Sequence, residues 1–308
     1  NVLIKVICFT HARLYEMSVK QVSLPVVVPH ESDPDIIFIS NIAIKISDVF
    51  RGIRESVNEL EDDYRELTCG FPLVNIRPGL EDSHNCTTLQ YSFKNAISNG
   101  LSYEYEKLYD HLEKQPNFNR PSFLAKEAVF ARKILGIIHA SSGGLARGTE
   151  IVQLKFVNSL DGTRNIYLSN DQFVYVIIYS KTGIHDPVVR FIPPSVSRIL
   201  FNYLVYLVDV RNMMYLADCS KVHPYAIYIC PSSTDYDLVK FYKTFAELFL
   251  YAVGCEITLS NFRHLVKYLM KTFCPTELVQ NDMLDKQFGH TEEVANSVYA
   301  VSSRTAFS

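Results

Sequence analysis

The 308-residue chain contains a tyrosine whose neighbours in the sequence suit phosphoryl transfer. Tyr299 follows a Gly-His pair, with His290 nine residues before it. A tyrosine hydroxyl is a poor nucleophile in water, and it becomes useful at phosphorus when cationic side chains neutralise the phosphate that it attacks. Three cationic residues precede it, in the order Arg147, Lys181, Arg263. This order predicts an enzyme that cleaves a DNA strand through a tyrosyl-phosphate intermediate.

The first arginine lies in the segment Leu145-Ala-Arg-Gly-Thr-Glu-Ile-Val-Gln-Leu154. The guanidinium of Arg147 offers a planar fork that matches two phosphate oxygens, and Glu150 can hold that fork from behind. Leu154 would anchor the element in the core. The same residues also fit an ordinary surface Arg–Glu pair, which is common and weakly stabilising. The local sequence leaves both interpretations open.

The next two cations each have a structural and a chemical interpretation. Lys181 lies in a Ser-Lys-Thr-Gly turn between two predicted strands. From a hairpin tip it could protonate the departing 5′ oxygen, or it could be a solvated turn residue. Arg263, in Ser260-Asn-Phe-Arg-His264, is either a second phosphate clamp or an arginine that extends its head from an apolar helix face. His264 fits a structural or hydrogen-bonding neighbour better than a catalytic group.

The last motif raises a geometric question. Thr291 is a plausible helix N-cap, followed by Glu292 and Glu293 in the first turn. At about 100° per residue, nine residues leave His290 and Tyr299 on opposite sides of one helix. The two side chains can converge only if the histidine lies outside the helix or the helix breaks before the tyrosine. Otherwise Tyr299, one of 19 tyrosines, is a packed aromatic residue.

Elements that could position these residues follow from periodicity and turn signals. Apolar residues at helical spacing predict helices at 47–68, 89–113, 122–140, 196–208, 236–253, 259–273 and 292–299. β-rich runs between turn residues predict an antiparallel meander with strands at 150–156, 165–168, 173–179 and 188–192. Residues 1–45 contain β-branched runs to which no stable role is assigned, and 116–121 is the best linker candidate. The predicted fold is mainly α with a small antiparallel β-sheet (α+β), as a mostly helical domain at 1–115 followed by a second domain at 116–308.

Composition narrows the class of protein. Hydrophobic residues make up 48% of the chain and charged residues 20%, which is typical of a globular protein. The net charge of −3, and the 15 basic and 15 acidic residues within 147–308, mean that any DNA affinity must come from local clustering of positive charge.

Seven scattered cysteines without a C-x-x-C pair predict buried thiols in a reducing, intracellular compartment. No apolar run reaches the roughly 18 residues of a membrane span. The absence of an initiator Met indicates a piece of a larger polypeptide.

The order of motifs resembles the catalytic domain of tyrosine recombinases, the phage integrase superfamily. The first motif of that family is Gly-x-Arg-x-x-Glu-x-x-x-Leu, which this chain matches from the arginine onward. A hairpin lysine follows in the family, and its last motif is Gly-His with the tyrosine nine residues after the histidine. The central family motif is His-x-x-Arg followed by His. Here Ser260 stands in place of the first histidine, while Arg263 and His264 match.

Longer phrases resemble a more particular group. Ala-Arg-Gly-Thr-Glu-Ile, Asn-Ser…Arg-Asn-Ile-Tyr-Leu and Arg-Phe-Ile-Pro-Pro are similar to Crypton-like recombinase segments of fungal mobile elements, which are often associated with RecQ-like helicase sequences. The resemblance covers about residues 110–308. Residues 1–110 match only in position, as the place where these proteins carry a helical core-binding domain.

The resemblance implies a mechanism and a set of partners. Tyr299 would form a 3′-phosphotyrosyl link and free a 5′ hydroxyl, Lys181 would be the general acid, and three groups would stabilise the phosphate: Arg147, Arg263 and His290. Supporting roles would fall to Glu150, Ser260 and His264. The implied partners are double-stranded DNA, other copies of the chain in a dimer or tetramer, and a helicase region in the same polypeptide. No metal or other cofactor is needed, and in a eukaryote the protein would be nuclear.

Three alternatives remain open. Serine at position 260 cannot exchange protons near neutral pH as imidazole can, which favours a degenerate recombinase fold that binds DNA without cutting it. A type IB topoisomerase would use similar chemistry to relax supercoils. A purely structural region of a helicase polypeptide would have no DNA affinity.

Overall fold

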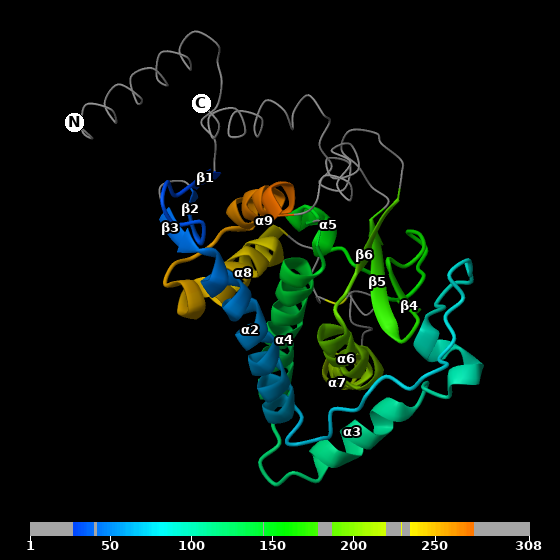
Figure 1. Cartoon of the computed structure of the whole chain (residues 1–308). Coiled ribbons are helices and arrows are strands. Elements are labelled where there is room, and N and C mark those ends of the chain that lie inside the picture. Colours follow the sequence, from blue (N-terminus) through cyan, green and yellow to red (C-terminus); the bar gives the residue numbers. More distant parts are fainter. Residues whose placement is uncertain are drawn as a thin grey trace, which may run out of the picture. The chain divides into compact units, whose positions relative to one another are not determined.

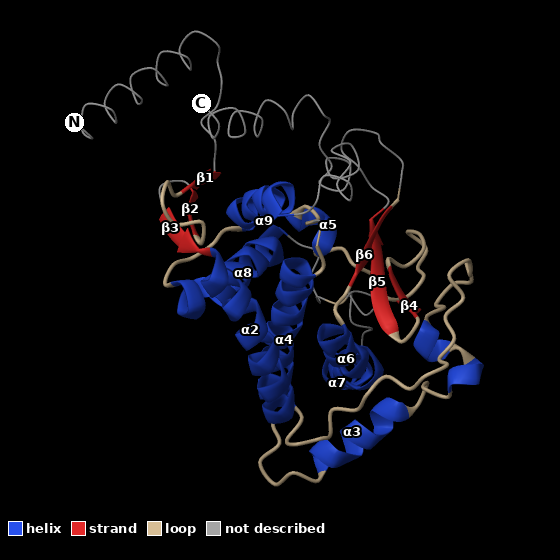
Figure 2. Ribbon diagram, viewed as in Figure 1, coloured by secondary structure: helices blue, strands red, loops and turns tan. Residues whose placement is uncertain are grey.

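The computed structural model describes residues 27–39, 42–143, 145–177, 187–219, 229 and 235–273 (Figure 1). The chain forms two compact units: one comprises Asn1–Ile46 with Ser260–Ser308, and the other is Ser47–Leu259. The fold is mixed α+β with two small three-stranded antiparallel sheets, as the strands in Figure 2 show. No helix in the described ranges is long and apolar enough to cross a membrane.

The first unit contains a sheet that the sequence analysis did not assign. Its strands, in the spatial order β1-β2-β3, are Val27–Pro29, Ile36–Ile39 and Ile42–Lys45. Side chains alternate across this sheet, so that Ile37, Ile39 and Ile44 are buried whereas Phe38 is exposed. The β-branched runs of this region therefore form a half-buried meander.

Helix α9 (Leu259–Phe273) follows the second unit and lies almost wholly in the first. It has the bounds that periodicity predicts. Phe262 and Leu265, three residues apart on one helix face, are both buried.

The second unit is built on long helices. Helix α2 (Ile46–Leu67) places Leu60 and Tyr64 in the core, and it ends where Cys69 and Gly70 adopt positive φ angles of 52° and 84°. The amide of Gly70 donates to the carbonyl of Arg65 at 2.8 Å, which closes the C-terminus of the helix. These bounds confirm the predicted helix at 47–68.

Helix α4 (Arg120–Ser141) lies at the centre of the unit, in contact with α6, α7 and α8. Asn119, within the predicted linker, caps α4 by accepting a hydrogen bond from the amide of Ser122 at 2.9 Å. Gly136 lets α8 (Asp235–Val253) approach closely, since a Cβ there would lie 2.8 Å from Cδ1 of Leu248. Both helices confirm their predictions.

The helical tract after β6 (Val188–Phe191) contains a π-helix, which the buried Lys94 contacts. The predicted helix at 196–208 is present, and it continues as α6 (Pro194–Asn202), the π-helix η3 (Tyr203–Leu207) and α7 (Val208–Cys219). The Lys94 ammonium donates to the Leu204 carbonyl at 3.4 Å and to Asp209 at 2.7 Å. Burial lowers the pKa of Lys94, and the charge of Asp209 opposes that change.

Three of the four predicted strands of the second unit are present. They are β4 (Ile166–Ser169), β5 (Gln172–Ile177) and β6 (Val188–Phe191), in the order β4-β5-β6. The strand predicted at 150–156 is wrong, because residues 148–151 form the short helix α5 (Gly148–Ile151). The helix predicted at 89–113 is present only as α3 (Glu104–Glu113), preceded by 3₁₀ turns at Phe93–Asn95 and Ile97–Asn99.

One hydrophobic core runs through this unit. It includes Leu60 of α2 and Leu108 of α3 together with Ile134 of α4 and Phe173 of β5. The core thus contains residues from both sides of position 115, and the division into domains at 115 stays a prediction. The helix predicted at 292–299 lies outside the described residues.

Candidate functional site

Arg147 occupies the N-cap position of α5 and is held there by Glu150. The Arg147 amide donates to Oε2 of Glu150 at 2.7 Å, which is the backbone half of a capping box. Nη1 of Arg147 lies 3.3 Å from Oε1 of the same carboxylate. The Arg147 side chain is 26% exposed and that of Glu150 is 10% exposed. The carboxylate therefore holds an arginine whose side chain is partly exposed.

Glycine after Arg147 allows a close approach of α8. A Cβ at Gly148 would lie 2.5 Å from both Cε1 and Oη of Tyr242 on α8. Tyr242 is 39% exposed, and burial raises the pKa of its hydroxyl, so this group stays protonated at neutral pH. The Arg-Gly pair of the motif thus combines a cap with a close helix contact.

The same carboxylate lies close enough to the β5–β6 pair to act on it electrostatically. Tyr175 of β5 is opposite Arg190 of β6, whose Cζ lies 5.6 Å from the tyrosine ring centroid. Burial lowers the pKa of Arg190, while Tyr175 and Glu150 act in the opposite direction. The Tyr175 hydroxyl lies 2.9 Å from Oγ of Ser142, at the C-cap of α4. Arg190 belongs to the Arg-Phe-Ile-Pro-Pro phrase, and it is a buried neighbour of the site that the sequence analysis did not single out.

Lys181 belongs to the segment that joins β5 to β6. The two strands pair as far as Ile177 and Val188, and the lysine lies between these positions in the chain, outside the described residues. Its role as general acid stays a prediction. His290 and Tyr299 also lie outside the described residues.

The central motif lies on one helix of the first unit. Ser260, Arg263 and His264 all fall in the first half of α9. Burial lowers the pKa of His264, and the positive charges of Arg263 and Lys267 lower it further. The imidazole is therefore neutral at pH 7. The structure brings Arg147 together with Glu150 in one unit and gathers the central motif in the other.

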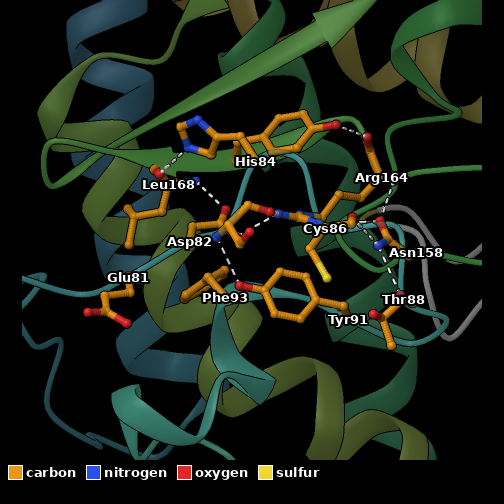
Figure 3. Close-up of polar contacts among 12 residues, drawn as sticks. Glu81, Asp82, His84, Cys86, Thr88, Tyr91, Phe93, Asn158, Arg164 and Leu168 are labelled. Atoms are coloured by element: carbon orange, nitrogen blue, oxygen red, sulfur yellow. Dashed lines mark hydrogen bonds and ion pairs between the residues drawn. The ribbon is translucent and has the colours of Figure 1, made fainter.

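A second polar cluster, which the sequence analysis missed, is buried beside β4 (Figure 3). Nη2 of Arg164 lies 2.5 Å from Oδ1 of Asp82, and the two side chains are 1% and 0% exposed. The Arg164 guanidinium also stacks between two aromatic rings, 4.8 Å from the centroid of Tyr91 and 4.6 Å from that of Tyr167. This ion pair joins the loop before the 3₁₀ turn Phe93–Asn95 to the segment that leads into β4.

Asn158 completes the cluster (Figure 3). Its amide nitrogen donates to the carbonyls of Cys86 and Thr88 at 2.8 and 3.0 Å, and its Oδ1 accepts from the Arg164 amide at 3.0 Å. The other Asp82 oxygen accepts from the amide of Leu168 in β4 at 2.9 Å. Burial raises the pKa of Asp82, against the opposing effects of the Leu168 amide and of Arg164. The phrase Asn-Ser…Arg-Asn-Ile-Tyr-Leu thus contains the residues that fix β4 and the preceding loop.

The buried cluster and the Arg147 site differ in access. Asp82 and Arg164 are sealed from solvent, so their arrangement suits support of the fold. Arg147 is partly exposed and could contact an anion. Within the described ranges, no group of three or more His, Cys, Asp or Glu side chains could hold a metal ion.

Comparisons with known proteins assign the chain to no family. No family model matches the chain, and no solved structure matches it significantly. The protein is therefore a mixed α+β protein with an arginine–glutamate pair at the start of a short helix, and the resemblance to tyrosine recombinases stays a prediction.

Proposed function

We propose that the chain cleaves and rejoins double-stranded DNA through a 3′-phosphotyrosyl intermediate, in site-specific recombination or in integration and excision of a mobile element. The observation that carries the proposal is the arrangement of Arg147. Nη1 of its guanidinium lies 3.3 Å from Oε1 of Glu150, an arrangement that suits the recombinase motif, and the arginine side chain is 26% exposed. Arg190 and Tyr175, near the same carboxylate, lie on the two strands that the Lys181 segment joins.

The proposed reaction conserves the energy of the phosphodiester. The Tyr299 hydroxyl gives its proton to solvent as its oxygen attacks phosphorus, the bond from phosphorus to the 5′ oxygen breaks, and Lys181 donates a proton to that oxygen. Arg147, Arg263 and His290 stabilise the charge on the non-bridging oxygens. A 5′ hydroxyl from another strand then attacks the phosphotyrosine and gives its proton to the neutral Lys181. The P–O bond to tyrosine breaks, and the tyrosine oxygen takes up a proton from solvent.

A nicked suicide substrate tests this chemistry, because loss of a short 5′ fragment traps the covalent adduct. The native chain is expected to form the adduct and Tyr299→Phe to form none. Tyr103→Phe is the matched control, since Tyr103 is 72% exposed on α3's N-terminal side and belongs to no motif. Failure of the native chain to form an adduct on the ends of its own element would contradict the proposal.

A second candidate function is DNA binding without cleavage, and Ser260 is the residue that favours it. The variant Ser260→His separates the two. If the active site is otherwise intact, the added imidazole should increase the rate of adduct formation, since it restores a proton-exchanging group. DNA binding without adduct formation by either form would favour the binding module. Relaxation of supercoiled DNA without sequence preference would instead favour a type IB topoisomerase.

A further inference from the structure

A groove lies between three helices of the second unit, on a surface to which the proposed chemistry gives no role. It has a volume of about 300 Å³ and is lined by α2, α4 and α8. The residues of α2 that line it (Gly52, Glu55, Ser56 and Glu59) recur at helical spacing on one face of that helix.

The walls of the groove are fixed by direct contacts. A Cβ at Gly52 would lie 2.7 Å from Cβ of Ala252, so α2 and α8 touch at this point. Nη2 of Arg51 donates to the Ala252 carbonyl at 3.1 Å, and Oγ of Ser56 to the Leu248 carbonyl at 3.4 Å. These contacts between α2 and α8 hold the walls of the groove together.

Its lining combines negative charge with exposed apolar surface. Three glutamates line it, against one lining cation, Lys133, which is paired with Asp63 at 2.5 Å. Glu55 lies 3.6 Å from Arg51 and Glu247 lies 3.7 Å from Lys243, both exposed pairs within one helix, and Glu59 completes the lining. Helix α2 as a whole carries seven acidic residues and three arginines. Val129 and Leu250, also in the lining, are 42% and 40% exposed. Such a groove is suited to a segment that carries both lysine or arginine and aliphatic side chains.

The chain itself contains a segment of this composition. Residues 1–26 carry Lys5, Arg13 and Lys20 against one acidic residue, Glu16, and most of the remaining positions are aliphatic or aromatic. In contrast, residues 1–115 as a whole contain 11 basic and 17 acidic residues. A basic apolar segment and an acidic groove on one chain form the two different surfaces that a head-to-tail contact between copies requires.

We propose that the groove between α2, α4 and α8 binds residues 1–26 of a second copy of this chain. Charge pairs give the contact its specificity, because Glu55 and Glu59 face the basic side chains of residues 1–26. The aliphatic side chains of that segment cover Val129 and Leu250. This contact would join protomers before or during DNA binding. The contact does not require DNA cleavage, so it can be tested apart from the proposed function.

Sedimentation velocity of the full chain without DNA is the test. The native chain is expected to associate as its concentration rises, and to dissociate at high salt because screening weakens the charge pairs. The charge reversals Glu55→Lys/Glu59→Lys and Arg13→Glu/Lys20→Glu should each weaken association by roughly tenfold or more, since attraction becomes repulsion. Combining all four substitutions should restore it.

The matched control is Glu106→Lys/Asp110→Lys, a pair of exposed acidic residues four positions apart on α3 and away from the groove. It should leave association unchanged, and circular dichroism should show all variants to be folded. A native chain that stays monomeric at every concentration would overturn the proposal. So would association that neither reversal weakens, or that the combined variant fails to restore.

Discussion

The backbone amide of Arg147 and the carboxylate of Glu150 are joined by a hydrogen bond of 2.7 Å, while the arginine side chain lies 3.3 Å from the same carboxylate. The carboxylate of Glu150 thus caps α5 by accepting from the backbone amide of Arg147, and it orients the arginine through its guanidinium. The spacing Arg-x-x-Glu is what a capping box needs, because the third residue of a helix is the one that reaches back to the cap. A structural role and a phosphate-orienting role are therefore compatible in the same pair.

Substitutions at position 150 should separate these two roles. Glu150→Gln keeps an acceptor for the Arg147 amide but removes the charge that acts on Arg147 and Arg190, so it should lower the free energy of unfolding less than loss of the cap does, while DNA affinity or adduct formation falls. Glu150→Ala removes the cap as well and should lower the free energy of unfolding by about 1 kcal/mol. Urea denaturation together with DNA-binding titrations would measure both effects. Equal loss of stability in the two variants would contradict the capping role.

Gly148→Ala should destabilise the protein even though alanine is the better helix former. In an open helix the change would stabilise by roughly 0.5–1 kcal/mol. Here the new Cβ would lie 2.5 Å from the Tyr242 ring and hydroxyl, and overpacking of this kind costs about 1–3 kcal/mol. The double variant Gly148→Ala/Tyr242→Ala should lose less stability than the sum of the single variants. Thermal unfolding of the four proteins would complete the cycle, and strict additivity would count against the contact.

Sequence periodicity predicted the long helices well, because each buries one apolar face. Helix α9 has its predicted bounds, α2 differs from its prediction by a single residue at each end, and α8 begins one residue earlier than predicted. The sequence analysis predicted β4, β5 and β6 from β-rich runs between turn residues. Burial alternates along β4, whereas β5 buries the three consecutive residues Phe173, Val174 and Tyr175. Local pattern is sufficient where one face of an element meets the core.

The error at 150–156 has a local cause. The run from Ile151 to Phe156 is β-rich in composition, yet the Arg147–Glu150 cap starts a helix just before it. Ile151 is buried within that helix, and Leu154 is buried in the segment that follows it. Capping outweighed strand propensity there.

The Asp82–Arg164 pair could not be predicted, because its members are 82 residues apart and neither lies in a recognisable spacing. Long-range pairs of this kind are set by the tertiary fold.

Breaking the Asp82–Arg164 pair should be among the most damaging single changes in the described part of the chain. Arg164→Met would leave the Asp82 carboxylate buried without its cation, which costs about 3–5 kcal/mol and raises the pKa of Asp82 further. The double variant Asp82→Leu/Arg164→Met removes both charges and should lose less stability than the single one. Chemical denaturation would measure this.

The control for that prediction is Arg65→Met, which removes one partner of an exposed pair. Arg65 is 57% exposed and pairs with Glu61 and Asp62 within α2. Exposed pairs contribute about 0–1 kcal/mol, so this variant should stay close to the native stability. Similar losses at positions 65 and 164 would show that burial of Arg164 has little energetic weight.

Protonation of His264 should make the protein less stable in mild acid. Burial, assisted by the charges of Arg263 and Lys267, lowers the pKa of this imidazole below its ordinary value of 6.5. The unfolded chain therefore binds a proton near pH 6.5 that the folded chain does not yet bind. The free energy of unfolding should fall as the pH drops through 6.5 and continue falling until the folded-state pKa is passed. Titration of the His264 ring signals by NMR would give that pKa directly, and His264→Gln should remove this part of the pH dependence. A folded-state pKa at or above 6.5 would show that the neighbouring cations and burial do not act on the ring as described.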